Sequence, residues 1–167
     1  MSIDSLQQLL VEQLEDLYDA ETRLTKALPN LAQRATNADL KQALDDHLTE
    51  TLEQVQRLEQ CFEALGAPAR GKACAGMRGI IDESTEHAGE DYGGDDLRDL
   101  VIIGSAQRAE HYEIAAYRTA AAHARLLDRT DVVSLLEDTL DEEKAADMKL
   151  TELAATVIYP DPHPGYR

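Results

Sequence analysis

Apolar residues recur at intervals of three and four along four long stretches of the chain, which is the spacing of one face of an α-helix. The first stretch covers about residues 2–35 and the second about 38–65, where Gly66 ends the pattern. Two further stretches cover about 95–127 and 131–158. The pattern therefore predicts an all-α protein whose four long helices bury their apolar faces against one another.

The segment between the second and third stretches, residues 67–96, has a different character. It is rich in glycine and contains one short helical candidate, at about 77–87. Neighbouring antiparallel helices need a connection of only roughly two to eight residues, so a segment of this length can run along the whole height of a bundle. We therefore predict a long crossover that contains a short helix, with Leu65 and Leu97 at opposite ends of the bundle.

Prolines interrupt the helical pattern at two places. Pro29 lies inside the first stretch, where it removes one backbone hydrogen bond, so we expect a kink or a break in that helix. Residues 159–167 contain three prolines, which exclude a helix and predict an extended C-terminal arm. The remaining residues, 1–158, fit a single bundle domain, because a chain of 167 residues can bury one core but not two independent ones.

Each of the four apolar stripes is interrupted near its middle by residue types that bind metal ions. Counting from the predicted turns at about 1.5 Å per residue places these interruptions at one level of the bundle. Acidic side chains are rarely buried without partners, so interruptions on four helices at the same level favour a functional site over four solvated helix faces. The candidate ligands are Glu21 on the first helix, His47 and Glu50 on the second, Glu110 and Glu113 on the third, and Glu143 and Asp147 on the fourth.

The chemistry of this set predicts a dinuclear metal site. Burying several carboxylates without counter-charge costs several kcal/mol each, and no Lys or Arg lies on these stripes at that level. Carboxylate oxygens with an imidazole suit iron or manganese, and carboxylates from facing helices bridge two ions in known bundles. We therefore expect two Fe or Mn ions per chain. Zn is an alternative, although a set without thiolates argues against a zinc-finger-like structural site.

Several polar residues near this level have other possible roles. His47 can be a ligand or a hydrogen-bonded core histidine, and Gln54 is expected to contact the ligands rather than the metal. His111 follows Glu110 directly and so points about 100° away, toward the surface. For the tyrosines we favour aromatic packing, with hydrogen bonds to carboxylates as the alternative. These tyrosines are Tyr18, Tyr112 and Tyr117.

The formal charge of −17, from 33 acidic and 16 basic residues, disfavours nucleic acid and anionic membrane surfaces as partners. The first residues lack a basic region followed by an apolar run, and no apolar stretch is long enough to span a membrane. We therefore expect a cytoplasmic protein. Cys61 and Cys74 show no metal-binding or disulfide spacing, so we expect two buried or partly buried thiols.

Four segments resemble the motifs of a known family, the YciF/YciE-like stress proteins of the ferritin-like superfamily. They are DLYDAE (16–21), HLTET (47–51), AQRAEHYEIAAY (106–117) and TLDEEKAADMKL (139–150). The resemblance covers nearly the whole chain. It implies a ferritin-like bundle with one long crossover, a carboxylate-bridged di-iron or di-manganese site, and a homodimer.

One departure from the wider superfamily concerns the second and fourth helices. The superfamily typically has Glu-x-x-His on both of them. Here the second helix has His47-x-x-Glu50, and the fourth has Glu143-x-x-x-Asp147 without histidine. The role of His47 is therefore the part of the site that the resemblance specifies least.

Two classes of function fit these observations. In the first, a redox-active dinuclear centre reacts with O₂ or peroxide, as an oxidase, a ferroxidase or a peroxide-degrading enzyme. In the second, a non-catalytic stress or structural protein uses the metals to stabilise its bundle, and its function lies in assembly or partner binding. An iron-storage cage is less favoured, because nothing in the sequence specifies cage interfaces. The sequence does not separate the first two classes.

Overall fold

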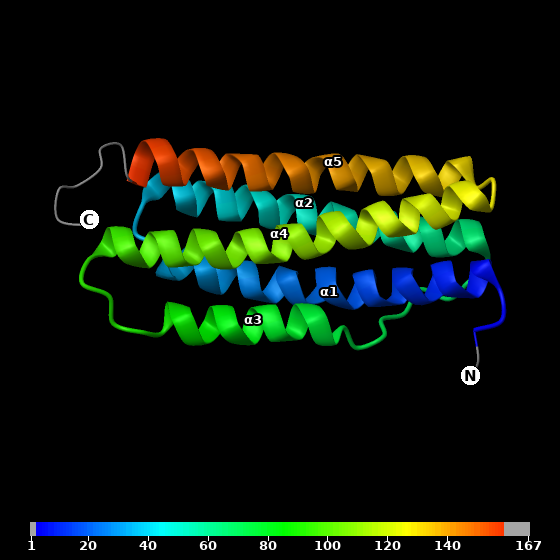
Figure 1. Cartoon of the computed structure of the whole chain (residues 1–167), viewed down its shortest axis with the longest axis horizontal. Coiled ribbons are helices and arrows are strands. Elements are labelled where there is room, and N and C mark those ends of the chain that lie inside the picture. Colours follow the sequence, from blue (N-terminus) through cyan, green and yellow to red (C-terminus); the bar gives the residue numbers. More distant parts are fainter. Residues whose placement is uncertain (1–2, 159–167) are drawn as a thin grey trace.

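The computed structural model describes residues 3–158, which form one helical bundle (Figure 1). No strand occurs in this range, so the all-α prediction is confirmed. The predicted C-terminal arm, 159–167, lies outside the described residues. The helices are α1 (Leu6–Arg34), α2 (Ala38–Leu65), α3 (Ala75–Ala88), α4 (Asp95–Leu126) and α5 (Thr130–Glu152), followed by a π-helical segment (Leu153–Ile158).

The helix ends follow local sequence signals. The side chain of Asn37 accepts hydrogen bonds from the backbone N–H groups of Asp39 and Leu40, which caps the start of α2. Gly66 ends α2 in the left-handed conformation, with φ at 66°, which glycine adopts without steric cost. The break expected at Pro29 does not occur, because α1 continues to Arg34. Pro29 is exposed, so its ring meets solvent rather than a neighbouring helix.

The predicted crossover topology is confirmed. In Figure 1, α2 ends at one end of the bundle and α4 begins at the other, with α3 lying alongside α1 in between. At the end of α2, the side chain of Arg129, in the α4–α5 turn, donates to the carbonyl of Ala64 at 2.6 Å. At the start of α4, the carboxylate of Asp99 accepts a hydrogen bond from the backbone N–H of Thr36, in the α1–α2 turn, at 2.8 Å. Thus α2 and α4 run parallel, as in a ferritin-like bundle.

The core is divided into two apolar clusters, one toward each end of the bundle. One cluster includes Leu24 of α1, Leu44 of α2, Ala106 of α4 and Leu150 of α5. On each long helix the other cluster lies on the far side of the predicted site residues, and it contains Leu17, Leu58, Tyr117 and Leu140. The middle of the bundle is therefore left to polar side chains. Within residues 3–158, no helix combines the length and the apolar composition needed to cross a membrane.

Candidate metal centre

Polar side chains from all four long helices fill the layer between the two apolar clusters. Glu21, Glu113 and Glu143 are 0% exposed, Glu110 is 1% exposed and His47 is 6% exposed. Each of the five was selected from the sequence as a candidate ligand, and the fold brings them together. They reach the same level because the helical period places them on the core-facing stripe of α1, α2, α4 and α5.

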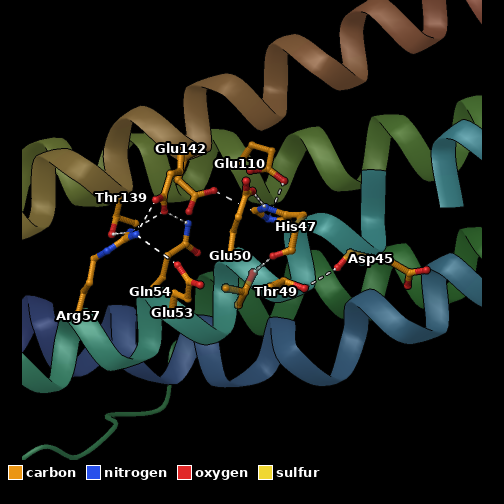
Figure 2. Close-up of polar contacts among 12 residues, drawn as sticks. Asp45, His47, Thr49, Glu50, Glu53, Gln54, Arg57, Glu110, Thr139 and Glu142 are labelled. Atoms are coloured by element: carbon orange, nitrogen blue, oxygen red, sulfur yellow. Dashed lines mark hydrogen bonds and ion pairs between the residues drawn. The ribbon is translucent and has the colours of Figure 1, made fainter. Parts of the chain in front are cut away.

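Four of these residues form a tight cluster. One ligand atom from each of His47, Glu110, Glu113 and Glu143 lies within 4.8 Å of those of the other three. His47 Nε2 is 3.2 Å from Glu110 Oε1 and 3.9 Å from Glu143 Oε2 (Figure 2 shows His47 and Glu110). Ligand atoms bound at about 2.1 Å around one small ion lie about 3–4 Å apart, so this cluster is already close to the size of a coordination sphere.

Glu21 extends the cluster on the side of α1. Its carboxyl and that of Glu113 shift each other's pKa, and so do the carboxyls of Glu110 and Glu143. The hydroxyl of Tyr117 donates to Glu21 Oε1 at 2.5 Å. The layer therefore contains two facing carboxyl pairs, which is the arrangement that two bridged ions would need.

Most ligand atoms of this layer have no hydrogen-bond donor. A carboxylate only accepts hydrogen bonds, so two facing carboxylates cannot satisfy each other without a proton or a cation between them. An uncompensated buried charge is costly, and the donor set therefore fits a divalent cation. Among the described residues, the buried atoms without a hydrogen-bond partner include Glu21 Oε2, Glu110 Oε2, both carboxylate oxygens of Glu113 and of Glu143, and His47 Nδ1.

Burial and the neighbouring carboxylates also shift the pKa values of these side chains. Burial, followed by the charge of Glu143, raises the pKa of Glu21 to about 8, and burial is also the main reason that the pKa of Glu110 is about 8. Burial and the neighbouring carboxylates raise the pKa of Glu113 and of Glu143 well above the ordinary value. Burial alone would lower the pKa of His47, but the surrounding carboxylates outweigh it and raise that pKa. A bound cation would have to displace these protons.

Two other candidate ligands lie at the margin of the layer. The Glu50 side chain is 47% exposed, and its Oε2 is 3.6 Å from His47 Nδ1 (Figure 2). Asp147, 21% exposed, accepts a 2.9 Å hydrogen bond from Gln107 and lies 3.4 Å from His111 Nε2. Asp147 follows Glu143 by four residues, so it is rotated by about 40° around α5 and faces α4 rather than the core. The structure does not bring Asp147 into the cluster.

A second polar group, beside the cluster, anchors α5 to α2. Gln54 is fully buried and donates to Glu142 at 3.1 Å, while Arg57 binds both Glu142 oxygens, at 2.5 and 2.6 Å (Figure 2). Burial alone would raise the pKa of Glu142, but these donors outweigh it and lower that pKa. Gln54 thus supports the residue preceding Glu143. Sequence reasoning missed Arg57 and Glu142, although Arg57 lies one helical turn after Gln54.

The hydroxyls of the three tyrosines singled out in the sequence donate to carboxylates, which was the less favoured interpretation. Besides the Tyr117 contact, Tyr112 donates to Asp16 at 2.6 Å and Tyr18 donates to Glu59 at 2.9 Å. Tyr117 also packs in the apolar core, so both interpretations hold for it. Cys61 and Cys74 are buried free thiols, as predicted.

A pocket of about 310 Å³ opens onto one side of the cluster. Its polar lining includes His47, Glu50 and Glu110, with Asp46 and Lys149 also contributing. Its apolar walls are Ala43, Leu44, Ala145, Ala146 and Leu150. A small molecule or an ion in this pocket would contact the otherwise buried layer through His47 and Glu110.

Comparison with known proteins agrees with this fold. Residues 5–160 match the family described as "Domain of unknown function (DUF892)". The chain is 39% identical over 155 residues to Protein YciF of Escherichia coli (strain K12), covering 92% of this chain and 93% of that protein. The crystal structure of that E. coli stress protein has a TM-score of 0.88, with 92% of this chain and 97% of the other covered.

Two further structures place the fold. YcfI from Rhodopseudomonas palustris, a suggested structural protein, is 44% identical with a TM-score of 0.89, covering 92% of this chain and 98% of the other. A ferritin-like, diiron-carboxylate protein from Bacillus anthracis str. Ames is 15% identical, with a TM-score of 0.68 over 92% of this chain and all of the other. At that identity the likeness shows the ferritin-like fold alone.

Proposed function

The chain belongs to the DUF892 family, and from the layer that its four long helices build we propose that it holds two iron or manganese ions and reacts with O₂ or peroxide. The observation that carries the proposal is the group of buried carboxylate oxygens without hydrogen-bond donors. No described lysine or arginine forms an ion pair with these carboxylates. Two divalent cations would supply the missing positive charge.

The donor set favours iron or manganese over other metals. The two carboxyl pairs, Glu21 with Glu113 and Glu110 with Glu143, would hold the ions between facing helices, and His47 would add one imidazole nitrogen. Glu50 would complete the set from the pocket side after a side-chain rotation. Oxygen-rich sets with an imidazole suit Fe and Mn, and Zn is the alternative to be excluded by metal analysis.

When bound, such ions supply the electrons and open coordination positions that O₂ or peroxide reduction requires. The chain's own residues supply access and proton handling. The pocket beside Ala145 and Ala146 admits a small reactant to His47 and Glu110. On the pocket side, Glu50 Oε2 lies 3.6 Å from His47 Nδ1, so Glu50 can orient the imidazole and accept the Nδ1 proton while Nε2 serves as the ligand atom.

A second function, without catalysis, is favoured by the position of the layer. It separates two apolar clusters, so ions there would cross-link all four long helices and stabilise the bundle. The protein would then act in stress as a metal-stabilised scaffold. For both functions we expect a cytoplasmic homodimer, checked by cell fractionation and by light scattering.

Metal content and peroxide turnover together test the proposal. The purified chain, reconstituted anaerobically with Fe(II) or Mn(II), is expected to bind two ions, and Glu113→Gln combined with Glu143→Gln is expected to bind none. Glu53→Gln, a 65% exposed side chain on α2, serves as the control and should leave the metal content unchanged. A wild-type protein that binds no Fe, Mn or Zn would overturn metal binding. A loaded protein inert to O₂ and peroxide would leave the scaffold function.

A further inference from the structure

One surface hollow of the described chain has a charge opposite to that of the protein. It is a groove of about 580 Å³ between α1 and α3, which lie side by side (Figure 1). Four cationic side chains line it: Arg23, Lys26 and Arg34 from α1 and Arg78 from α3. Only two acids line it, although acidic residues outnumber basic ones 33 to 16 in the chain. We propose that this groove binds a small organic polyphosphate.

Two of the four cations make no direct polar contact within the described part of the chain, although the charge of Lys26 helps to lower the pKa of Asp19. Lys26 and Arg78 form neither an ion pair nor a side-chain hydrogen bond there, whereas eight of the chain's lysines and arginines pair with carboxylates. An anionic ligand would give both of them a partner.

The other two cations are already positioned. Arg23 Nε donates to Asp19 at 2.5 Å, and Arg34 Nη1 donates to the Ala88 carbonyl at the end of α3, at 2.7 Å. Each guanidinium keeps further N–H donors for a ligand, because arginine carries five. These contacts fix the long side chains, so less conformational entropy is lost when an anion binds.

The shape of the groove favours an elongated ligand with an apolar part. The lining of α1 extends from Asp19 to Arg34, about 22 Å along the helix. Its floor includes Ala27, Leu31 and Ile81, against which a flat apolar ring can pack. Ser84, also on the floor, is 7% exposed, and its hydroxyl has no hydrogen-bond partner among the described residues. Arg23, Lys26 and Arg78 precede Leu31 and Ile81 along α1 and α3, and Arg34 lies beyond them, so several phosphates would lie at the first three cations and the ring on the apolar floor that follows.

The test is calorimetric titration of the full chain with ATP and, separately, with inorganic tripolyphosphate. ATP is expected to bind, and Lys26→Ala combined with Arg78→Ala to weaken binding on the order of 100-fold, because two charge-assisted contacts are lost. The matched control, Lys41→Ala with Arg118→Ala, removes two exposed cations outside the groove and should keep wild-type affinity. Circular dichroism and thermal melting check that both variants fold.

Three results would overturn the proposal. No binding of ATP by the wild-type chain would exclude the site. Equal weakening in both double variants would mean that general electrostatics, not the groove, attracts the anion. Tripolyphosphate binding as tightly as ATP would exclude the contact between the ring and the apolar floor. None of these titrations requires bound metal, so their outcomes do not depend on whether the proposed metal centre is correct.

Discussion

The hydroxyl of Tyr117 on α4 donates a 2.5 Å hydrogen bond to Oε1 of Glu21 on α1, in the fully buried centre of the bundle. Burial and the negative charge of Glu21 raise the pKa of Tyr117 well above its ordinary value, so the phenol keeps its proton and acts as a fixed donor. This contact orients one candidate ligand and joins two helices across the core.

Replacing Tyr117 by phenylalanine tests this role. Tyr117→Phe leaves Glu21 Oε1 without its donor, so we expect metal affinity to fall about 10- to 100-fold. We also expect the unfolding free energy of the metal-free protein to fall by about 1–3 kcal/mol. Metal titration and urea unfolding measure the two effects. Tyr18→Phe also removes a tyrosine–carboxylate hydrogen bond, an exposed one to Glu59, and should leave metal affinity unchanged. Equal affinities in all three proteins would refute the orienting role.

The raised pKa values predict an unusual pH dependence for the metal-free protein. Glu21 and Glu110 have a folded-state pKa of about 8 against an ordinary value of 4.5. Their contribution to stability is fully present below the unfolded pKa and is lost as the pH rises through about 8. We therefore expect the metal-free melting temperature to fall between roughly pH 5 and pH 9.

The metal-loaded protein should respond in the opposite direction, because ions displace the protons and bind better as pH rises. The difference in melting temperature between loaded and metal-free protein should therefore grow with pH. Glu113→Gln should flatten the metal-free curve, since it removes one of the strongly shifted groups. A metal-free protein that becomes more stable from neutral to alkaline pH would contradict the pKa assignments.

The helical period predicted the long helices and the buried acids of the polar layer, but not the edge of that layer. Glu21, Glu110, Glu113 and Glu143 fall on the apolar stripes, and the structure buries all four. The stripe is wide, however, and a rotation of about 40° separates a core position from a rim position. The pattern therefore could not tell that Asp147 faces α4.

Long-range polar contacts were not predictable from the pattern. Arg57 and Glu142 each look like ordinary solvated residues of amphipathic helices, and only the packing of α2 against α5 brings them together. The same holds for Asp99, which lies 63 residues from Thr36. Such pairs depend on the lateral arrangement of helices, about which the period of a single helix carries no information.

Asp99 provides a test of that long-range contact. Its carboxylate, 1% exposed, accepts three hydrogen bonds: from the backbone N–H and the hydroxyl of Thr36, at 2.8 and 2.7 Å, and from the backbone N–H of Asn37, at 2.7 Å. Asp99→Ala would leave three donors unsatisfied, so we expect a loss of about 2–5 kcal/mol in unfolding free energy. Urea unfolding measures it. Asp96→Ala, an exposed position in the first turn of α4, should cost under about 1 kcal/mol.

Two glycines of α3 form a matched pair for testing how α3 packs against α4. A Cβ at Gly76 would lie 2.6 Å from Tyr112 Cε2, whereas a Cβ at Gly79 would meet nothing within 4 Å. Gly76→Ala should push the Tyr112 ring away from Asp16 and Cys74 and cost about 1–3 kcal/mol.

Gly79→Ala should instead stabilise the protein by about 0.5–1 kcal/mol, because alanine loses less backbone entropy in a helix. Thermal melting of both variants is the measurement. Stabilisation by both substitutions would mean that Tyr112 does not pack against α3 as observed.

The pocket beside the candidate metal centre leads to a prediction about kinetics rather than affinity. Ala146 lies in its wall, next to the opening onto His47 and Glu110. A leucine at this position would narrow a pocket of about 310 Å³, whose lining does not include Glu113 or Glu143. If ions reach the layer through this pocket, Ala146→Leu should slow both metal uptake and metal release at least about tenfold, while the equilibrium metal content stays at the wild-type value.

The measurement is the time course of Co(II) uptake, followed by its visible absorption, and of Co(II) release to a chelator. Ala122→Leu is the control, because Ala122 is an exposed alanine of α4 outside the pocket, and its rates should match those of the wild type. A lower metal content at equilibrium would show that leucine distorts the ligands. Unchanged rates at full occupancy would show that ions enter elsewhere, because narrowing the main path would slow the exchange.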